Sequence, residues 1–272
     1  MDMFPSQLLL SSKHHKEQIL NPIFEPFGTV LFVNEGFDTD DFGTFCGSIP
    51  RKEGPKYTVK EKCLAGMQFA TLRQGMASEG SFGPHPNIPI LTINEEWLVY
   101  IDLDLGLEIY GRSTTIEVCH AQLHYQDAAQ LPSFLSNCSF GKQGLVLKNA
   151  SSGQLLEKGI QEPAQLELLL QQIPEWQIET DLRAHMNPLR QKNIAAAGKD
   201  LMERMQRRCP NCAHPDFSVQ KVSGQLACSL CFQLTDNYQF LEYTCNYCAH
   251  HQIEERTDKK LEDPQFCNNC NP

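Results

Sequence analysis

CPNCAHPDFSVQKVSGQLACSLCFQLTDNYQFLEYTCNYCAHHQIEERTDKKLEDPQFCNNC (residues 209–270) contains four Cys-x-x-Cys pairs, separated by 15, 13 and 18 residues. Each pair can direct two sulfurs at one ion, and a second pair 15–20 residues away completes a tetrahedron. Eight thiolates therefore suffice for two structural, four-cysteine zinc sites. The predicted zinc ligands are Cys209, Cys212, Cys228, Cys231, Cys245, Cys248, Cys267 and Cys270.

The segment between the first two pairs favours one way of sharing these ligands. Residues 213–227 have the pattern of a β-hairpin, with Phe217, Val219 and Val222 as apolar positions and Ser223-Gly224 as the turn. A hairpin between two pairs is typical of a zinc ribbon, in which consecutive pairs bind the same ion. We therefore favour consecutive pairing, with interleaved, cross-braced pairing as the alternative. Three nearby histidines are expected to be solvated, because eight cysteines are already available: His214, His250 and His251.

The charge of this segment argues against a nucleic-acid partner. Residues 209–272 contain four Lys or Arg and eight Asp or Glu, a net charge of 4 − 8 = −4. Two Zn²⁺ held by eight thiolates would make it more negative still. Since affinity for a phosphate backbone needs a cationic surface, we expect the zinc module to stabilise the protein or to dock a protein partner.

The whole chain has 272 residues and a net charge of −10. Its first residues lack the basic and apolar regions of a signal peptide, and no run approaches the roughly 18 apolar residues of a membrane span. We therefore expect a cytoplasmic protein with no membrane contact. The other four cysteines have no ligand spacing and are expected to be reduced, mostly core residues: Cys46, Cys63, Cys119 and Cys138.

Strand and helix patterns alternate before the cysteine pairs, which predicts an α/β domain with a mixed sheet flanked by helices. The predicted domains are 1–205 for the α/β domain and 206–272 for a double zinc-ribbon module. The expected strands cover 7–11, 29–33, 88–93, 97–102, 107–110, 117–123 and 144–147. The expected helices cover 14–27, 58–72, 126–135, 163–173 and 188–208.

Local signals define three features of this domain. Thr58 and Glu61 form the S/T-x-x-E capping box of the second helix. The glycines and prolines of 77–86 predict a loop that a ligand can approach closely. Asn187 and Pro188 are expected to begin the last helix as N-cap and first residue.

Three polar segments are candidate ligand sites. The first is 11–17, at the start of a helix, where Ser12, His14 and Lys16 suit a phosphate group. The second is the loop 77–86, with Glu79 as a metal ligand or base; Asp102 on the next strand pair extends an acidic site for Mg²⁺. The third is 179–190. The residues expected to contact ligand are Ser12, His14, Ser81, His85, Arg183, His185 and Arg190. An exposed helical turn, a plain ordered connection and structural salt bridges are the respective alternatives.

Several of these segments carry two resemblances. The strings FDTDDFGTF (37–45), ASEGSFGPHP (77–86), ETDLRAHMNP (179–188) and CNNCNP (267–272) are similar to a bacterial family of unknown function. More distantly, residues 7–205 resemble the inosine/xanthosine triphosphate pyrophosphatase superfamily. Its T/S-x-N-x-x-K motif is similar to 11–16, with Lys16 matching and Lys13 in place of Asn. Its magnesium-binding Glu in a T-x-x-E-N-A pattern is similar to Glu61.

The second resemblance implies a nucleotide cleft and a Mg²⁺-dependent hydrolase of nucleotides or related phosphoesters. Lys16 would hold phosphate oxygens, and Glu61 and Glu79, with Asp102, would hold Mg²⁺ and activate a water. Arg183, His185 and Arg190 would read the rest of a small phosphorylated ligand. The rival interpretation is a non-enzymatic nucleotide- or ligand-binding protein whose zinc module docks a protein partner.

Overall fold

The computed structural model describes residues 4–34, 36–37 and 54–272, and they form two compact units, Met1–Leu201 and Met202–Pro272. Residues 38–45 of the string FDTDDFGTF (37–45) lie outside the described residues, and so does Cys46. No helix in the described ranges combines the length and the hydropathy that a bilayer span needs. The chain passes from one unit to the next within the helix α5, Pro188–Gln206.

The first unit is built on a five-stranded sheet with the order β2-β1-β3-β4-β5. Strand β1 pairs in parallel with both β2 and β3, whereas β3 with β4 and β4 with β5 pair antiparallel. The sheet is therefore mixed, as the sequence predicts. Its strands are β1 (Gln7–Ser11), β2 (Val30–Phe32), β3 (Gln74–Pro84), β4 (Thr92–Asp102) and β5 (Leu107–Thr115).

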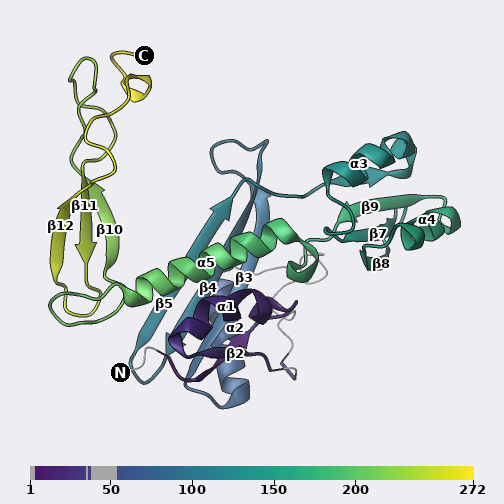
Figure 1. The fold of residues 1–272 in the computed structure, drawn as a ribbon, viewed down its shortest axis with the longest axis horizontal. Helices are drawn as coiled ribbons and strands as arrows, with labels where there is room; N and C mark the ends of the chain where they lie inside the picture. Colours follow the sequence, from purple (N-terminus) through teal and green to yellow (C-terminus); the bar gives the residue numbers. More distant parts are fainter. Residues whose placement is uncertain (1–3, 35, 38–53) are drawn as a thin grey trace. The chain divides into compact units, whose positions relative to one another are not determined.

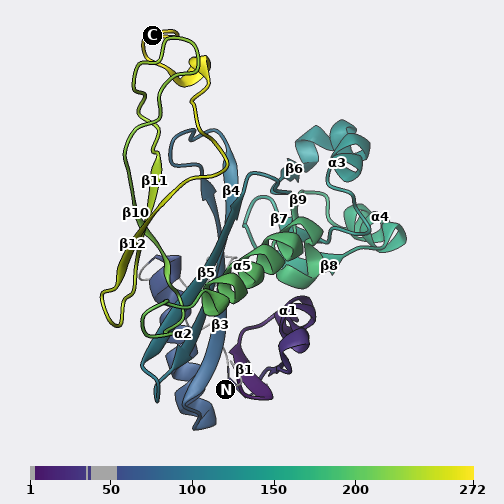
Figure 2. The same ribbon diagram turned by 60° about the vertical axis from the view of Figure 1, so that its left-hand side comes forward.

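Helices cover both faces of this sheet (Figures 1 and 2). The helices α1 (Lys16–Phe24) and α5 share one face, where Gly198 lies so close to Leu20 that an added Cβ would be 2.8 Å from it. The helix α2 (Pro55–Ala70) covers the other face, and its Val59 and Met67 pack with the buried β1 and β3 side chains. A short 3-10 helix, η1 (Glu25–Phe27), follows α1.

The segment 77–86, predicted to be a loop, is mostly strand. β3 runs for 11 residues to Pro84, so Glu79 lies within a strand opposite Trp97, and most of the predicted strand 88–93 is instead a turn. The glycines mark close approach rather than a loop. A Cβ at Gly75 would come within 2.6 Å of Met67, and one at Gly80 within 2.2 Å of Glu96 Oε1.

The helix α2 begins three residues earlier than its predicted capping box. Gly54 is the N-cap and Pro55 the first residue, so Thr58 already lies inside the helix. The Thr58 hydroxyl donates to the Gly54 carbonyl at 3.2 Å. The prediction of a cap by Thr58 and Glu61 is therefore wrong, and proline at the first helical position explains the earlier start.

The beginning and the buried face of α5 are as predicted. The Asn187 side chain accepts a hydrogen bond from the Arg190 N–H at 2.9 Å, which is N-cap geometry. Residues spaced three or four apart line the buried face: Ile194, Ala197, Leu201 and Met205.

The first unit also contains an antiparallel four-stranded sheet with the order β6-β9-β7-β8. Its strands are β6 (Gln122–His124), β7 (Leu145–Asn149), β8 (Leu155–Ile160) and β9 (Trp176–Thr180). The strands β8 and β9 were not predicted from the sequence. The helices η3 (Tyr125–Gln130), α3 (Leu131–Asn137) and α4 (Pro163–Gln172) accompany it, and η4 (Ala184–Met186) precedes α5. Leu145, Leu147 and Ile178 are fully buried at its centre.

The second unit is an antiparallel sheet of three strands, β10 (Ser218–Ser223), β11 (Phe240–Thr244) and β12 (His251–Glu255), followed by the short η5 (Pro264–Phe266). The expected hairpin within 213–227 does not form. Residues 218–223 make one strand, and that strand pairs with β11, beyond the second cysteine pair. Gly224, at φ 67°, follows the end of β10 rather than making a two-strand turn.

Candidate metal centres and a buried charge cluster

The eight cysteines of the second unit form two groups of four. Cys209, Cys212, Cys245 and Cys248 make one group, and Cys228, Cys231, Cys267 and Cys270 make the other. In the first group, Sγ–Sγ distances are 3.7 Å for Cys209 to Cys248 and 3.6 Å for Cys212 to Cys245. The corresponding distances in the second group are 3.8 and 3.6 Å.

These distances fit a tetrahedral zinc ion. Four sulfurs at the usual Zn–S length of about 2.3 Å lie about 3.8 Å from one another at the corners of a tetrahedron. A disulfide would need sulfurs about 2 Å apart, and the described cysteines are all free. Each group could therefore hold a zinc ion, with four thiolates and no open position for a substrate.

The backbone repeats the same turn at the first three cysteine pairs. The amide of the residue after the second cysteine donates to the carbonyl of the first, at 2.8 Å for Ala213 and 3.0 Å for Phe232 and Ala249. Those three residues have φ values of 57–59°, in the left-handed region. The turn directs both sulfurs of a pair to the same side, which the sequence pattern predicts.

The pairing is interleaved, so our preference for consecutive pairing is wrong. The reason lies in the strands between the pairs. β10, β11 and β12 each connect one pair to the next, and an antiparallel strand carries the chain from one end of the sheet to the other (Figure 1). Alternate pairs therefore meet at the same end. A two-stranded hairpin would have returned the chain to its starting end and given consecutive pairing.

None of the three nearby histidines belongs to a cysteine group in the described structure. The His214 ring stacks on Tyr247 with centroids 5.0 Å apart, and His250 packs on Phe217 at 5.8 Å. His251 lies 3.5 Å from a Glu242 oxygen. The expectation that cysteines alone supply the ligands is consistent with this arrangement.

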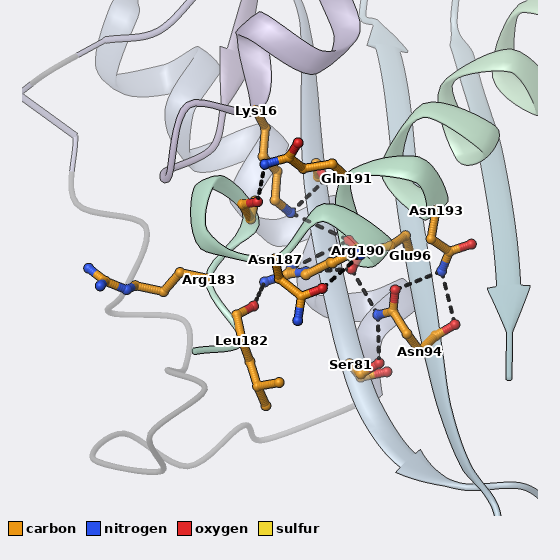
Figure 3. A network of polar contacts seen from close by, with 12 residues as sticks. Lys16, Ser81, Asn94, Glu96, Leu182, Arg183, Asn187, Arg190, Gln191 and Asn193 are labelled. Atoms are coloured by element: carbon orange, nitrogen blue, oxygen red, sulfur yellow. Dashed lines mark hydrogen bonds and ion pairs between the residues drawn. The ribbon is translucent and has the colours of Figure 1, made fainter. Parts of the chain in front are cut away.

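A second candidate site is a buried cluster of charges in the first unit, near the end of β1 (Figure 3). Lys16 Nζ donates to Ser78 Oγ at 2.9 Å and lies 3.6 Å from Glu96 Oε2. Arg190 Nε donates to the other Glu96 oxygen at 2.7 Å, and its Nη1 donates to the Leu182 carbonyl at 2.6 Å. Lys16, Glu96 and Arg190 are at most 4% exposed.

Asparagine side chains continue this network. Asn94 donates to Glu96 Oε1 at 2.9 Å and to the Ser81 carbonyl at 3.1 Å, and Asn193 of α5 donates to Asn94 Oδ1 at 2.8 Å. The cluster thus connects α1 and α5 to β3 and β4 on one face of the sheet. Lys16, Arg190 and Asn94, from α1, α5 and β4, share the carboxylate of Glu96 as their common partner.

The carboxylate of Glu79 points to the opposite face. In the β3–β4 register Glu79 pairs with Trp97 and Gly80 with Glu96, and side chains alternate faces along a strand. Lys62 of α2 makes a short hydrogen-bonded ion pair with Glu79. Glu79 and Glu96 therefore pair with buried cations on opposite faces of the sheet.

The environment shifts the ionisation of two cluster residues. Burial lowers the pKa of Lys16 to about 8, with the positive charge of Arg190 adding to the effect and Glu96 opposing it. Burial disfavours the ionised form of Glu96, but the charges of Arg190 and Lys16, with hydrogen bonds from Arg190 and Asn94, hold its pKa below the usual range. Glu96 is the anion that the two cations share.

The predicted magnesium ligands do not come together in the described structure. Glu61 makes no hydrogen bond or ion pair with Lys16 or Glu79 among the described residues; on α2 it is the neighbouring Lys62 that reaches Glu79. Asp102 lies five residues beyond Trp97, the partner of Glu79, which is about 17 Å along a strand. Its carboxylate accepts the backbone amides of Asp104 and Leu105 at 2.9 and 3.0 Å and so closes the β4–β5 turn.

The other predicted contact residues are placed as follows. Ser12 is buried at the end of β1, and its hydroxyl donates to the Lys13 carbonyl at 3.3 Å. His14 follows in the left-handed region at φ 68°. Ser81 lies on β3 and offers its carbonyl to Asn94. His85 Nδ1 accepts the amides of two following residues at 3.1 Å, so it stabilises the turn before β4.

Two of the remaining residues lie just before α5: Arg183 is the N-cap of η4, and His185 lies within η4. Arg190 lies in the first turn of α5. Arg183 makes a bidentate pair with Asp181, at 3.0 and 2.6 Å, and Arg190 belongs to the Glu96 network. The His185 ring lies 5.4 Å from that of His14 and 5.5 Å from that of His15. Burial, followed by the charge of Arg183, lowers the pKa of His185.

The sequence analysis missed Lys62, Glu96, Asn94 and Asn193. A signal for two of them exists. Asn94 and Glu96 alternate with other residues just before the apolar run Trp97–Ile101, so they share a face with the buried Leu98 and Tyr100. Polar residues at alternate positions that continue a buried face indicate a buried polar network.

Comparison with known proteins gives one match. Residues 62–272 match the model of a family described as a domain of unknown function, DUF6671. No curated protein and no solved structure matches. The matched region covers well over half of the chain, including β3, β4, α5 and both cysteine groups. The chain therefore belongs to the DUF6671 family.

Proposed function

We propose that this protein binds a small phosphorylated, or otherwise anionic, ligand at the carboxyl end of β1, and that its zinc module docks a protein partner. One observation carries the first part. Lys16 is 4% exposed at the end of β1, where its ammonium donates to the Ser78 hydroxyl at 2.9 Å and lies 3.6 Å from Glu96. A lysine ammonium at this position is suited to bind an anionic group such as phosphate.

The topology supports this location. From β1 the chain moves through α1 to β2 at one side, whereas β3 leads to β4 at the other side. The carboxyl ends of β1 and β3 therefore meet at a topological switch point, where α/β sheets commonly bind ligands. Ser78 and Glu79 of β3 extend just past Ser11, the last residue of β1, which pairs with Ala77.

The local geometry of the β1–α1 connection supports it further. His14 and His15 both have positive φ, at 68° and 58°, and strained non-glycine residues cluster at functional sites. Ser11 Oγ is buried and has no hydrogen-bond partner among the described residues.

Mg²⁺-dependent hydrolysis is the second candidate. It is favoured by Glu79 and Lys16, whose charges interact within the same cluster. The carboxylates argue for binding instead, because Glu79 is paired with Lys62 and Glu96 faces the other side of the sheet. A magnesium site formed as the pyrophosphatase resemblance implies would need Glu61 beside Glu79.

A binding assay with defined anions tests the proposal. Pyrophosphate and nucleoside triphosphates, with and without Mg²⁺, should raise the melting temperature of the zinc-loaded protein saturably, and chloride at equal ionic strength should not. Lys16→Met should abolish the shift, whereas Lys158→Met, on the exposed side of β8, should keep it. His14→Ala provides a second test if Lys16→Met fails to fold. No shift of the wild type with any of these anions would contradict ligand binding. Phosphate release that needs Mg²⁺ and Glu79 would establish hydrolysis.

Exposed apolar residues support docking by the zinc module. Leu230, Phe232 and Leu234, around the second cysteine pair, are 65–69% exposed, and the acidic surroundings disfavour nucleic acid. A photo-crosslinking amino acid at position 232 should give one discrete protein adduct in cells, and the same probe at the exposed Gln225 should not. Adducts to nucleic acid, or none, would contradict this part of the proposal.

A further inference from the structure

Two cysteines outside the zinc groups lie side by side in the first unit. Cys119 precedes β6, and Cys138 is the C-cap of α3. The Cys119 thiol donates to the Cys138 carbonyl at 3.9 Å, and the Cys138 thiol donates to the Leu135 carbonyl at 3.6 Å. Cys138 belongs to the buried core of the four-stranded sheet, and Cys119 packs against that core with part of its surface exposed.

The third described cysteine outside the zinc groups is placed differently. Cys63 of α2 is fully buried, and its thiol contacts the Met67 sulfur at 3.7 Å. Burial raises the pKa of Cys63, so it stays a thiol at neutral pH. No hydrogen bond links Cys63 to another described cysteine, and Cys63 is therefore the natural control for the pair.

The proximity of the two thiols makes the pair unequal. Interaction with Cys119 lowers the pKa of Cys138, and backbone hydrogen bonds at Cys138 and Phe140 act in the same direction. Interaction with Cys138, followed by burial, raises the pKa of Cys119. The first proton lost from the pair therefore leaves a thiolate on Cys138. The thiolate is the form that reacts with oxidants.

We propose that Cys119 and Cys138 form a reversible intrachain disulfide when the protein meets a peroxide. The Cys138 thiolate attacks one peroxide oxygen; the O–O bond breaks, and the departing hydroxide takes a proton and leaves as water. The sulfenic acid formed on Cys138 is then attacked by the Cys119 sulfur, which forms the S–S bond and releases a second water. Two thiols and one hydrogen peroxide give one disulfide and two waters.

The bond would fasten α3 to the segment that enters β6. It would also act close to the start of α5, because the Cys119 carbonyl accepts a weak hydrogen bond from Asn187 at 3.5 Å, and Asn187 caps the helix that carries Arg190. The modification therefore lies beside the polar network without using any of its charged groups.

The sequence makes the test direct. No Lys or Arg lies between Arg112 and Lys142, so trypsin releases both cysteines in one peptide, residues 113–142. Reduced, zinc-loaded protein is treated with increasing hydrogen peroxide, alkylated, denatured and digested. The expected peptide is two hydrogen atoms lighter and carries no alkyl group, and dithiothreitol restores double alkylation. The disulfide should form before zinc is released, and a chromophoric chelator measures the zinc release.

Variants separate the pair from general oxidation. Cys138→Ser should leave Cys119 open to alkylation after peroxide, and Cys63→Ser should leave the disulfide yield unchanged. Cys119→Ser, at the more exposed site, serves if Cys138→Ser does not fold. Two alkylated thiols in the peptide after zinc has been released, or bonds only between chains, would overturn the proposal.

Discussion

Cys209 and Cys248 are separated by 39 positions in the chain, and their Sγ atoms are 3.7 Å apart. Cys209 and the second pair, by contrast, belong to different groups although fewer residues separate them. Each of the two groups therefore draws its sulfurs from distant parts of the second unit, and the sheet of β10–β12 lies between them. Zinc at either group would hold that sheet at one end.

Double substitutions distinguish the interleaved arrangement from the consecutive one. Cys209→Ser with Cys245→Ser removes ligands from one group, so the purified protein should retain about one zinc per chain. Cys209→Ser with Cys228→Ser damages both groups and should lower zinc to well below one. Zinc is counted by elemental analysis. Consecutive pairing gives the reverse order, because Cys209 and Cys228 would then share an ion.

Chelation should unfold the second unit selectively. Few large apolar side chains are buried there, with Phe217 and Tyr243 packed between cysteines, and such small modules depend on their metal. After removal of zinc, hydrogen exchange of β10–β12 amides should rise by orders of magnitude, whereas β3 and β4 amides stay protected. Re-adding zinc should restore the protection. Unchanged exchange in β10–β12 would show that the sheet is stable without metal.

The ligand set could be predicted from the sequence, and its pairing depended on counting strands. Two cysteines with two residues between them reveal a metal hook locally, whatever the rest of the chain does. Pairing depends on whether one or two strands separate successive hooks. Residues 218–223 make one strand of six residues, and the residues 224–227 that remain before Cys228 are too few for a second strand paired with it. The Ser223-Gly224 signal marked the end of a strand and not a hairpin.

The candidate ligand site was harder to predict, because a glycine can indicate either a loop or a position in a strand where another part of the chain approaches closely. Gly80 was expected to lie in a loop that a ligand can approach closely, but it lies in a strand where Glu96 and Arg190 leave no room for a Cβ. Lys16 was found from its place after a strand. Lys62 was missed because an ion pair between distant elements leaves no local pattern. The alternation of faces that separates Glu79 from Glu96 becomes visible only once the strand register is known.

Glu96→Gln should lower the free energy of unfolding by about 3–5 kcal/mol, because it leaves two buried cations without their anion. Glu108→Gln is the matched control. Glu108, on β5, pairs with Lys60 of α2 but is more than one-third exposed, so the loss of this ion pair should cost less than about 1 kcal/mol. Urea unfolding of both variants measures the difference. Similar losses would mean that the Glu96 pair contributes no more than a surface pair.

The effect of Glu96 should also depend on pH. Its folded pKa lies below the ordinary value of 4.5, so its contribution is complete above that value and is lost as the pH falls through the folded pKa. Wild type and Glu96→Gln should therefore converge in stability in acid. Convergence that begins near pH 7 would contradict a lowered pKa.

Because of Lys16, the free energy of unfolding should rise as the pH rises through the alkaline range. The pKa of Lys16 is about 8 in the folded protein against 10.5 when unfolded, so the folded state binds fewer protons between these values. Stability then rises with pH across that window, by about 3 kcal/mol in total at about 1.4 kcal/mol per unit. The measurement is the unfolding free energy of wild type minus that of Lys16→Met from pH 7 to 10.5. Other groups titrate in both proteins and cancel, so a flat difference would contradict the lowered pKa.

Gly111→Ala should loosen the contact between β5 and α5. A Cβ at Gly111 would lie 2.3 Å from the Ala197 carbonyl oxygen and 2.7 Å from the Leu201 backbone nitrogen, so the helix backbone itself would have to move. Such overpacking costs about 1–3 kcal/mol.

Gly83→Ala is the control on β3, because nothing lies within 4 Å of its added Cβ and its φ is not in the left-handed region. That control should match the wild type within about 0.5 kcal/mol or exceed it slightly, since alanine restricts the unfolded chain. Urea unfolding compares the two, and hydrogen exchange should show faster exchange in α5 for Gly111→Ala alone. Equal stability of both variants would mean that α5 does not pack on β5 as closely as these distances require.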